Sequence, residues 1–197
     1  MSHQKENPFI SFYGQHDISP VRQDLSDMKE HLRRREKLYR SLGLPPFIFS
    51  GRKVLEVGPG GGYNSLAFVT WGAKMVFVEP NPKAQAELPV LLTKQGIKND
   101  QWILYPCKIE DYNTPDKYDL IFAEGFIPGL WDRKIIISKL ADLVSLGGVI
   151  TVTCIDDISF FFENLKRLVA VQLTKDVLTF DEKVRVLVKA FTFSQLA

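Results

Sequence analysis

The residues most able to do chemistry in this chain of 197 residues are three glutamates and one run of glycines. Residues 53–57 form a short apolar pattern that contains Glu56, and a glycine-rich run at residues 58–62 follows directly. Glycines lack Cβ atoms and permit φ > 0, so a ligand can lie against the backbone of such a turn. A helix starting near residue 63 would direct its free N–H groups at that ligand. The stretch predicts a nucleotide or adenosyl site.

Two further carboxylates occupy equivalent places in the pattern. Residues 74–79 and 118–124 each read as an apolar strand that finishes on an acid, Glu79 in one and Glu124 in the other. Strand and helix patterns alternate about five times, which predicts an α/β fold with a parallel sheet and helices on both faces. Ligands bind at the carboxyl ends of strands in such sheets. The three acids are therefore expected around one site.

The elements that position these acids are predicted from hydrophobic period and from turn residues. Strands are expected at residues 53–57, 74–79, 102–105, 118–124 and 149–154. Helices are expected at residues 21–42, 63–71, 81–95 and 131–146, with Pro89 kinking or dividing the third and Gly147-Gly148 ending the fourth. Residues 1–19 are expected to be irregular but packed on the domain. Helical segments, one capped by Asp181, are expected after residue 157 without further strands.

Composition narrows the class of protein. The apolar fraction of 45% and charged fraction of 24% are typical of a soluble globular protein. A net charge of +2 gives no argument for nucleic acid or membrane as a partner. Cys107 and Cys154 form no C-x-x-C pair and have no histidine cluster nearby, so no metal site is expected. Without a secretory signal or membrane-spanning run, the cytoplasm is the default location.

The glycine spacing distinguishes two cofactor classes. The dinucleotide fingerprint G-x-G-x-x-G would need a glycine where Tyr63 stands. Glu56, Gly58, Gly60 and Gly62 instead match E/D-x-G-x-G-x-G, and this resembles motif I of the class I S-adenosylmethionine-dependent methyltransferases. The resemblance extends over roughly residues 52–157.

The resemblance implies a Rossmann-like, doubly wound, mostly parallel sheet with an N-terminal helical extension. The family core has seven strands, and the chain is expected to lack the last two, either as a fragment of a longer protein or as a variant. Three regions are predicted: an N-terminal arm and helix at residues 1–50, a cofactor-binding core at 51–157, and C-terminal helices at 158–197. Apolar surface left exposed by missing strands would favour a homodimer.

The resemblance also implies S-adenosyl-L-methionine as cofactor and S-adenosyl-L-homocysteine as product. The glycine loop would pass under the methionine part, and Glu79 would bind the ribose hydroxyls. After the third strand the family reads adenine with an acid and a neighbouring backbone N–H; here Lys108 replaces that acid, or the acid is displaced to Glu110 or Asp111. The cofactor-binding residues predicted in this way are Glu56, Gly58, Pro59, Gly60, Gly62, Glu79, Pro80, Ile109, Glu110, Asp111 and Gly125.

Methyl transfer to oxygen also needs a general base. The candidates are His16, Glu124, Asp156 and Asp157, with His16 first because histidine titrates near neutrality and an N-terminal arm commonly covers this site in the family. His16 and Glu124 are the predicted catalytic residues.

The predicted function is methyl transfer from S-adenosylmethionine to an oxygen or nitrogen of a small molecule or glycan. No N-P-P-Y motif follows residue 124, which argues against a nucleobase or glutamine amide as acceptor. The alternatives are an NAD-dependent oxidoreductase and a non-catalytic module that only binds the cofactor.

Overall fold

The computed structural model describes residues 8–20, 22–130 and 132–192. The chain divides into two compact units, Met1–Thr153 and Cys154–Ala197. The first unit contains the sheet and the predicted site. The second contains the last two helices.

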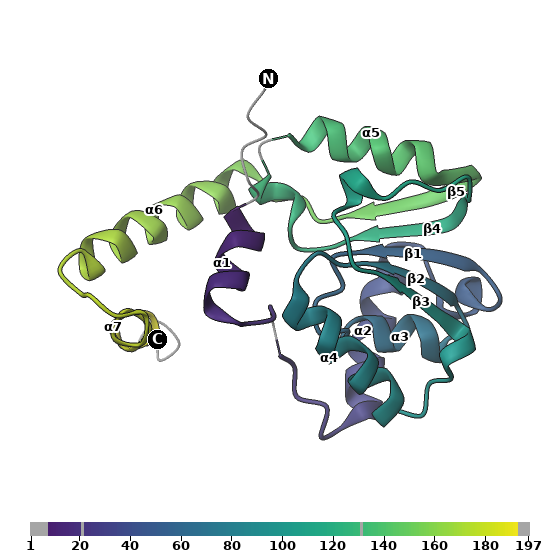
Figure 1. Cartoon of the computed structure of the whole chain (residues 1–197), viewed down its shortest axis with the longest axis horizontal. Coiled ribbons are helices and arrows are strands. Elements are labelled where there is room, and N and C mark those ends of the chain that lie inside the picture. The colour runs from purple at the N-terminus through teal and green to yellow at the C-terminus, as the bar shows by residue number, and fades with distance from the viewer. Residues whose placement is uncertain (1–7, 21, 131, 193–197) are drawn as a thin grey trace. The chain divides into compact units, whose positions relative to one another are not determined.

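The first unit is built on a five-stranded sheet in the order β3-β2-β1-β4-β5, with every neighbouring pair parallel (Figure 1). β2 and β3 lie on one side of β1, and β4 and β5 lie on its other side. The carboxyl ends of β1 and β4 therefore flank the topological switch point. The predicted Rossmann-like fold, with the five strands expected, is confirmed. The strands are β1 (Lys53–Val57), β2 (Lys74–Val78), β3 (Trp102–Tyr105), β4 (Tyr118–Ala123) and β5 (Val144–Val152).

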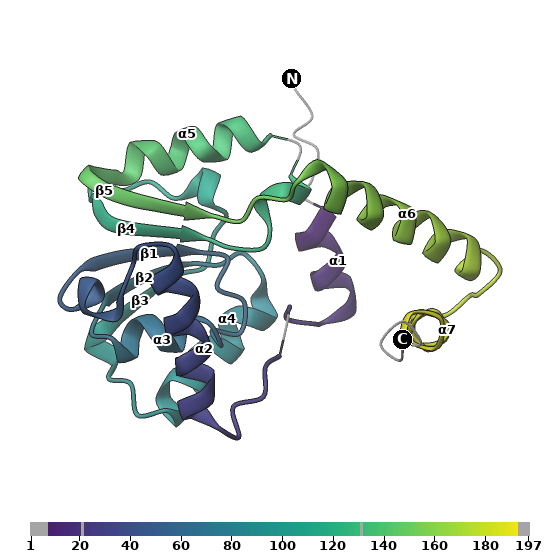
Figure 2. The same cartoon turned by 180° about the vertical axis from the view of Figure 1, so that it is seen from behind.

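Helices cover both faces of this sheet, with α5 on one side and α2, α3 and α4 on the other (Figures 1 and 2). The helices of the first unit are α1 (Pro8–His16), α2 (Met28–Ser41), α3 (Ser65–Thr70), α4 (Pro82–Lys94) and α5 (Arg133–Leu143). Four short 3₁₀ turns connect elements, η1 (Pro46–Phe49), η2 (Asn99–Gln101), η3 (Ile109–Asp111) and η4 (Ile127–Gly129). Side chains alternate along each strand, so each face has its own buried cluster.

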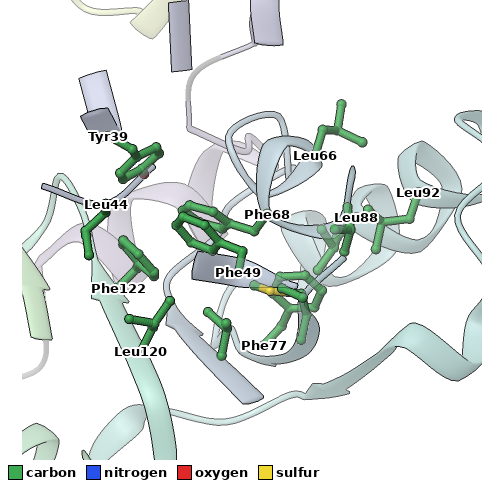
Figure 3. Close-up of a cluster of buried hydrophobic side chains, with 14 residues drawn as sticks. Tyr39, Leu44, Phe49, Leu66, Phe68, Phe77, Leu88, Leu92, Leu120 and Phe122 are labelled. Carbon is green, nitrogen blue, oxygen red and sulfur yellow. The ribbon is translucent and has the colours of Figure 1, made fainter. Parts of the chain in front are cut away.

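Aromatic rings fix helix α2 to the strand that carries the site (Figure 3). Tyr39 of α2 lies with its ring centroid 5.4 Å from that of Phe122 on β4, and Phe68 of α3 stacks on Phe122 at 4.4 Å. Phe49 stacks on Phe68 at 5.2 Å. Such pairs are each worth about 1 kcal/mol beyond the area that they bury. The cluster therefore holds Tyr39 rigidly below the end of β4.

Two predictions near the N-terminus are wrong. The arm expected to be irregular contains α1, a helix of nine residues. Helix α2 begins at Met28 rather than near residue 21, because the Asp27 carboxylate accepts the Glu30 N–H at 2.9 Å and caps it. Val21, the predicted start, lies outside the described residues.

The predicted boundary between the fourth helix and fifth strand is also wrong. Helix α5 ends at Leu143 and β5 starts at Val144, so Gly147 and Gly148 lie inside a strand. A Cβ on Gly148 would come within 2.8 Å of the Asp119 carbonyl oxygen, and the β4–β5 register shifts at this point. The glycine permits a close backbone approach at a strand irregularity rather than stopping a helix. Pro89, expected to kink or divide α4, lies inside a helix that continues to Lys94.

The second unit consists of α6 (Asp157–Thr174) and α7 (Phe180–Thr192), as the helical pattern predicts. Asp181 lies in the first turn of α7 and is not its cap. Thr179 takes that role, because its Oγ1 accepts the Glu182 N–H at 3.3 Å while its hydroxyl donates to the Glu182 carboxylate at 2.7 Å. Among the described residues, no helix is both long and apolar enough to span a bilayer.

Candidate functional site

The three strand-end glutamates share one face of the sheet. Glu56 pairs in register with Phe77 on one side and with Phe122 on the other, and Glu79 and Glu124 follow those two residues by two positions. Because side chains alternate with a period of two, all three carboxylates point to the face covered by α2, α3 and α4. This register brings the three carboxylates to the same edge and the same face of the sheet.

The glycine turn after β1 uses the conformations that only glycine adopts readily. Gly58, Gly60 and Gly62 have φ values of 69°, 57° and 83°. A Cβ on Gly62 would lie 2.1 Å from Cδ1 of Leu88, so this residue also lets the turn press against α4. The turn is thus packed between β1 and α4, and its glycines carry no side chains that could separate a ligand from the backbone.

Glu79 ties the glycine turn to the end of β2. Its Oε2 accepts the Gly60 N–H and its Oε1 accepts the Asn81 N–H, each at 2.8 Å. The side chain is 5% exposed, and burial raises its pKa. Each carboxylate oxygen has two lone pairs, so both oxygens can still accept a ligand hydroxyl. The geometry leaves the carboxylate fixed and suited to a vicinal diol.

The N-terminal arm is fastened beside Glu79. The Asn81 side-chain amide donates to the Ile18 carbonyl at 3.0 Å, and Lys83 forms an ion pair with Asp17 at 3.0 Å. Pro20 then lies against the turn, since its Cγ is 3.1 Å from where a Cβ on Gly60 would be. These contacts place the arm over the glycine turn.

Glu124 is held by groups from α2. Arg35 donates to both of its carboxylate oxygens, at 3.2 and 3.0 Å, and Tyr39 donates to Oε1. The Arg35 and Glu124 side chains are 12% and 23% exposed. Burial and the neighbouring Glu124 charge raise the pKa of Tyr39 above its usual value, so its hydroxyl keeps its proton. Arg35 and Tyr39 therefore hold the Glu124 carboxylate in a fixed position at the end of β4.

Glu56 is buried, and few hydrogen bonds offset the cost of removing its carboxyl group from water. It is 4% exposed, and its Oε2 and the Ser65 hydroxyl oxygen are buried atoms without a hydrogen-bond partner among the described residues. Burial raises the pKa of Glu56 to about 8, and the Glu124 carboxylate adds to this rise, against the opposing effects of the neighbouring Ser65 hydroxyl and of Arg35. This carboxyl group is therefore protonated at neutral pH in the folded chain.

The buried Glu56 carboxyl group gives a testable pH dependence. Between about pH 4.5 and 8 the folded state holds a proton that the unfolded state has released, so stability falls as pH rises through this window. The slope approaches about 1.4 kcal/mol per pH unit. Glu56→Gln should reduce this slope, measured by urea unfolding between pH 5 and 8, and leave the smaller contribution of Glu79. Glu110→Gln, on the surface, should keep the wild-type slope, and an unchanged slope in Glu56→Gln would refute the assignment.

Two cavities meet at the carboxyl ends of the strands. The first contains about 630 Å³ of empty space, part of it open to solvent, is mainly apolar, and lies over the ends of β2 and β3. The second contains about 920 Å³ of empty space, also partly open to solvent, and lies beside the glycine turn and the end of β4. Four residues line both cavities, Tyr13, Pro20, Gly58 and Phe126. The two cavities are therefore neighbouring compartments of one crevice.

The predicted site residues divide between these compartments. Gly58, Glu79, Pro80, Ile109 and Glu110 line the first. Gly58, Pro59, Gly60, Glu124 and Gly125 line the second. Neither lining includes Glu56, Gly62, Asp111 or His16.

His16 lies at the end of α1, with its ring 4.7 Å from that of Phe12. From the same helix it is Tyr13 that reaches both compartments. The alternative bases Asp156 and Asp157 lie in the second unit, at the start of α6.

Sequence reasoning missed several residues of the crevice. Tyr13 and Phe126 line both compartments, and Asn81, expected only as a helix cap, also holds the arm. His31 lies outside the two cavity linings and was also missed. It is 1% exposed, and its Nε2 lies 2.9 Å from the carbonyl oxygen of Tyr63, the residue directly after the glycine turn. Burial lowers the pKa of His31. The available sequence signal was its position on the apolar side of an amphipathic helix.

Comparison with known proteins supports the fold. No protein-family model matches the chain. The structure is similar to that of PKMT2 from Rickettsia typhi in complex with AdoHcy, with a TM-score of 0.61 and 23% identity over 83% of this chain and 32% of that one. It is similar to an S-adenosylmethionine-dependent methyltransferase from Clostridium acetobutylicum, with a TM-score of 0.51 and 18% identity over 74% of this chain and 56% of that one.

A third similar structure is the glycopeptide N-methyltransferase MtfA complexed with S-adenosylmethionine, with a TM-score of 0.50 and 15% identity over 59% of this chain and 51% of that one. The chain thus spans between a third and just over half of the length of these proteins. At these identities the likeness concerns the fold alone, a Rossmann-like α/β fold that the chain shares with these proteins.

Proposed function

We propose that the chain binds S-adenosyl-L-methionine in the crevice and supports transfer of its methyl group to an acceptor. The observation that carries this proposal is the position of Glu79, whose buried carboxylate is fixed between the glycine turn and the first cavity. A carboxylate in this place accepts from both hydroxyls of a ribose. The methyltransferase fold agrees with this assignment.

The compartments suit the two ends of such a cofactor. The apolar first cavity would hold the adenosine, with its ribose on Glu79. The methionine part would then run along the bare backbone of Gly58 and Gly60 into the second cavity. The sulfonium would lie near Tyr13 and Phe126, where the compartments meet, and aromatic faces stabilise a cation.

The chemistry is an in-line displacement. Bound S-adenosylmethionine would supply an electrophilic methyl group. The acceptor's lone pair would form a bond to the methyl carbon as the carbon–sulfur bond breaks, and the electrons of that bond would leave with sulfur as a neutral thioether. Placing the nucleophile supplies much of the rate, since effective molarities of oriented groups are large. The chain would hold the acceptor in the second cavity, among the polar groups of Gln23, Asn64 and Thr153.

The acceptor that we propose is a small molecule or glycan with an oxygen or nitrogen nucleophile, which the amide and hydroxyl groups of the second cavity favour. His16 is the proposed base for an oxygen acceptor, and reaching the cavity would require a movement of α1. Glu124 is the other proposed catalytic group, although Arg35 and Tyr39 already engage its oxygens. A homodimer and a cytoplasmic location remain predictions.

Ligand binding by the unlabelled protein tests the proposal. Thermal unfolding should shift upward with S-adenosylhomocysteine and stay unchanged with NAD at the same concentration. Stabilisation by NAD alone would instead favour the oxidoreductase. Binding of S-adenosylhomocysteine, without methyl transfer from S-adenosylmethionine to any acceptor, would favour a module that only binds the cofactor. With an acceptor in hand, His16→Ala should keep the thermal shift and lose transfer.

A further inference from the structure

Lys108 stands out among the residues of the first cavity. It follows β3 and precedes η3, and this half-buried residue lines the cavity together with Glu79 and Asn81. Within the described ranges its ammonium group forms no hydrogen bond or ion pair. A lysine that lines a largely apolar cavity and has no ionic partner is available to a ligand.

The order of the strands determines which part of a ligand would reach Lys108. With the ribose on Glu79 after β2 and the methionine part on the turn after β1, the base lies on the other side of the ribose, above the end of β3. The Glu79 N–H donates to the Tyr105 carbonyl at 3.1 Å, so these two strand ends are fixed together. Ile109 and Pro80 supply apolar walls for a planar ring.

Glu110 is the other charged group on this side of the cavity. Its side chain is exposed, whereas Lys108 is half-buried and Ile109 between them is only 4% exposed. Charge interactions of the more exposed group are screened by water and salt. Of these two charged residues, Lys108 is therefore the less screened.

We propose, resting on the function proposed above, that Lys108 sets the base specificity by donating hydrogen bonds to the acceptor atoms of a purine. An ammonium group has three donors and no acceptor. It can donate to the ring nitrogens of adenine and equally to the oxygen of a 6-oxo purine. The pocket does not depend on a 6-amino group, so it accepts inosyl and adenosyl ligands nearly alike.

A carboxylate at the same position would act in the opposite way. It would accept from the 6-amino group of adenine and repel the 6-oxo oxygen, and buried polar groups left unpaired are the strongest source of rejection. Exchanging Lys108 for aspartate should therefore convert a tolerant pocket into a selective one. Methionine, similar in length and without charge, separates the loss of the donor from the addition of an acceptor.

Titration calorimetry with S-adenosylhomocysteine and S-inosylhomocysteine tests this inference on the wild type, Lys108→Asp, Lys108→Met and the control Lys94→Met, an exposed lysine outside both cavity linings. We expect the two affinities to differ by less than about 5-fold in the wild type and Lys94→Met, and by more than about 30-fold in Lys108→Asp. Lys108→Met should weaken both ligands by a similar factor.

The inference is overturned if the wild type rejects the inosyl ligand by more than about 30-fold, or if the ratio of affinities stays the same in Lys108→Asp. Circular dichroism of each variant shows whether it is folded. If the aspartate variant is not, Lys108→Met carries the test, because unchanged affinities for both ligands in Lys108→Met would overturn the inference. Failure of the wild type to bind either ligand would mean that the proposed function is wrong. Binding of both ligands with the same ratio in Lys108→Asp, or with unchanged affinities in Lys108→Met, would refute this inference alone.

Discussion

Replacing Glu79 with glutamine is expected to lower the affinity for S-adenosylhomocysteine by on the order of 100-fold. The two carboxylate oxygens accept one backbone N–H each, from Gly60 and Asn81. Glutamine offers one oxygen and one NH₂ group, so a donor would face a donor in a buried place. Hydrogen bonds to charged groups contribute about 1.5–3 kcal/mol each, and the proposed contacts to the ribose are of this kind.

Titration calorimetry measures this effect directly, and Asp100→Asn is the control. Asp100 carries the same charge, is exposed and lines neither cavity, so its replacement should change the affinity less than about 3-fold. If Glu79→Gln binds S-adenosylhomocysteine as well as Asp100→Asn does, the ribose does not lie on Glu79 and the proposed orientation of the cofactor is wrong.

Gly62→Ala should produce the largest loss of stability among single substitutions in the turn. Gly62 has a φ of 83°, and an added Cβ would lie 2.1 Å from Cδ1 of Leu88. The left-handed conformation costs a non-glycine residue about 1–2 kcal/mol. Forcing a methyl group into a packed contact adds about 1–3 kcal/mol. We expect a loss of about 3–4 kcal/mol and a fall in Tm of roughly 10 °C.

Gly96→Ala separates these two contributions. Gly96 has a φ of 74° but nothing within 4 Å of an added Cβ, so its replacement should cost only the backbone conformation. Adding Leu88→Ala to Gly62→Ala should be less harmful than the sum of both changes, because the shorter side chain removes the clash. Equal losses in Gly62→Ala and Gly96→Ala would show that the turn does not press on α4.

The local sequence was sufficient to predict the elements whose structure depends on a single segment of the chain. β1 and β3 match their predicted bounds, because short apolar runs between polar residues leave little choice of register. Glycine at positions 58, 60 and 62 predicted positive φ, and the backbone has it. The acids at strand ends could be placed together because parallel strands share one carboxyl edge.

What could not be predicted depends on residues distant in the chain. Arg35 and Glu124 are separated by 89 positions, and only the packing of α2 on β4 makes them partners. In the sequence, Gly148 looks like the end of a helix. In the structure it permits the close approach of β5 to β4. Tyr13 reaches the crevice because Asn81 and Lys83 hold the end of the arm, and neither contact has a local signal.

The two aromatic side chains at the junction of the compartments have a consequence for turnover. Tyr13 and Phe126 line both cavities. Their ring faces would attract a ligand that arrives as a sulfonium cation. When the methyl group departs, the sulfur becomes neutral and this attraction ends. The spent cofactor would then be released more readily than the fresh one.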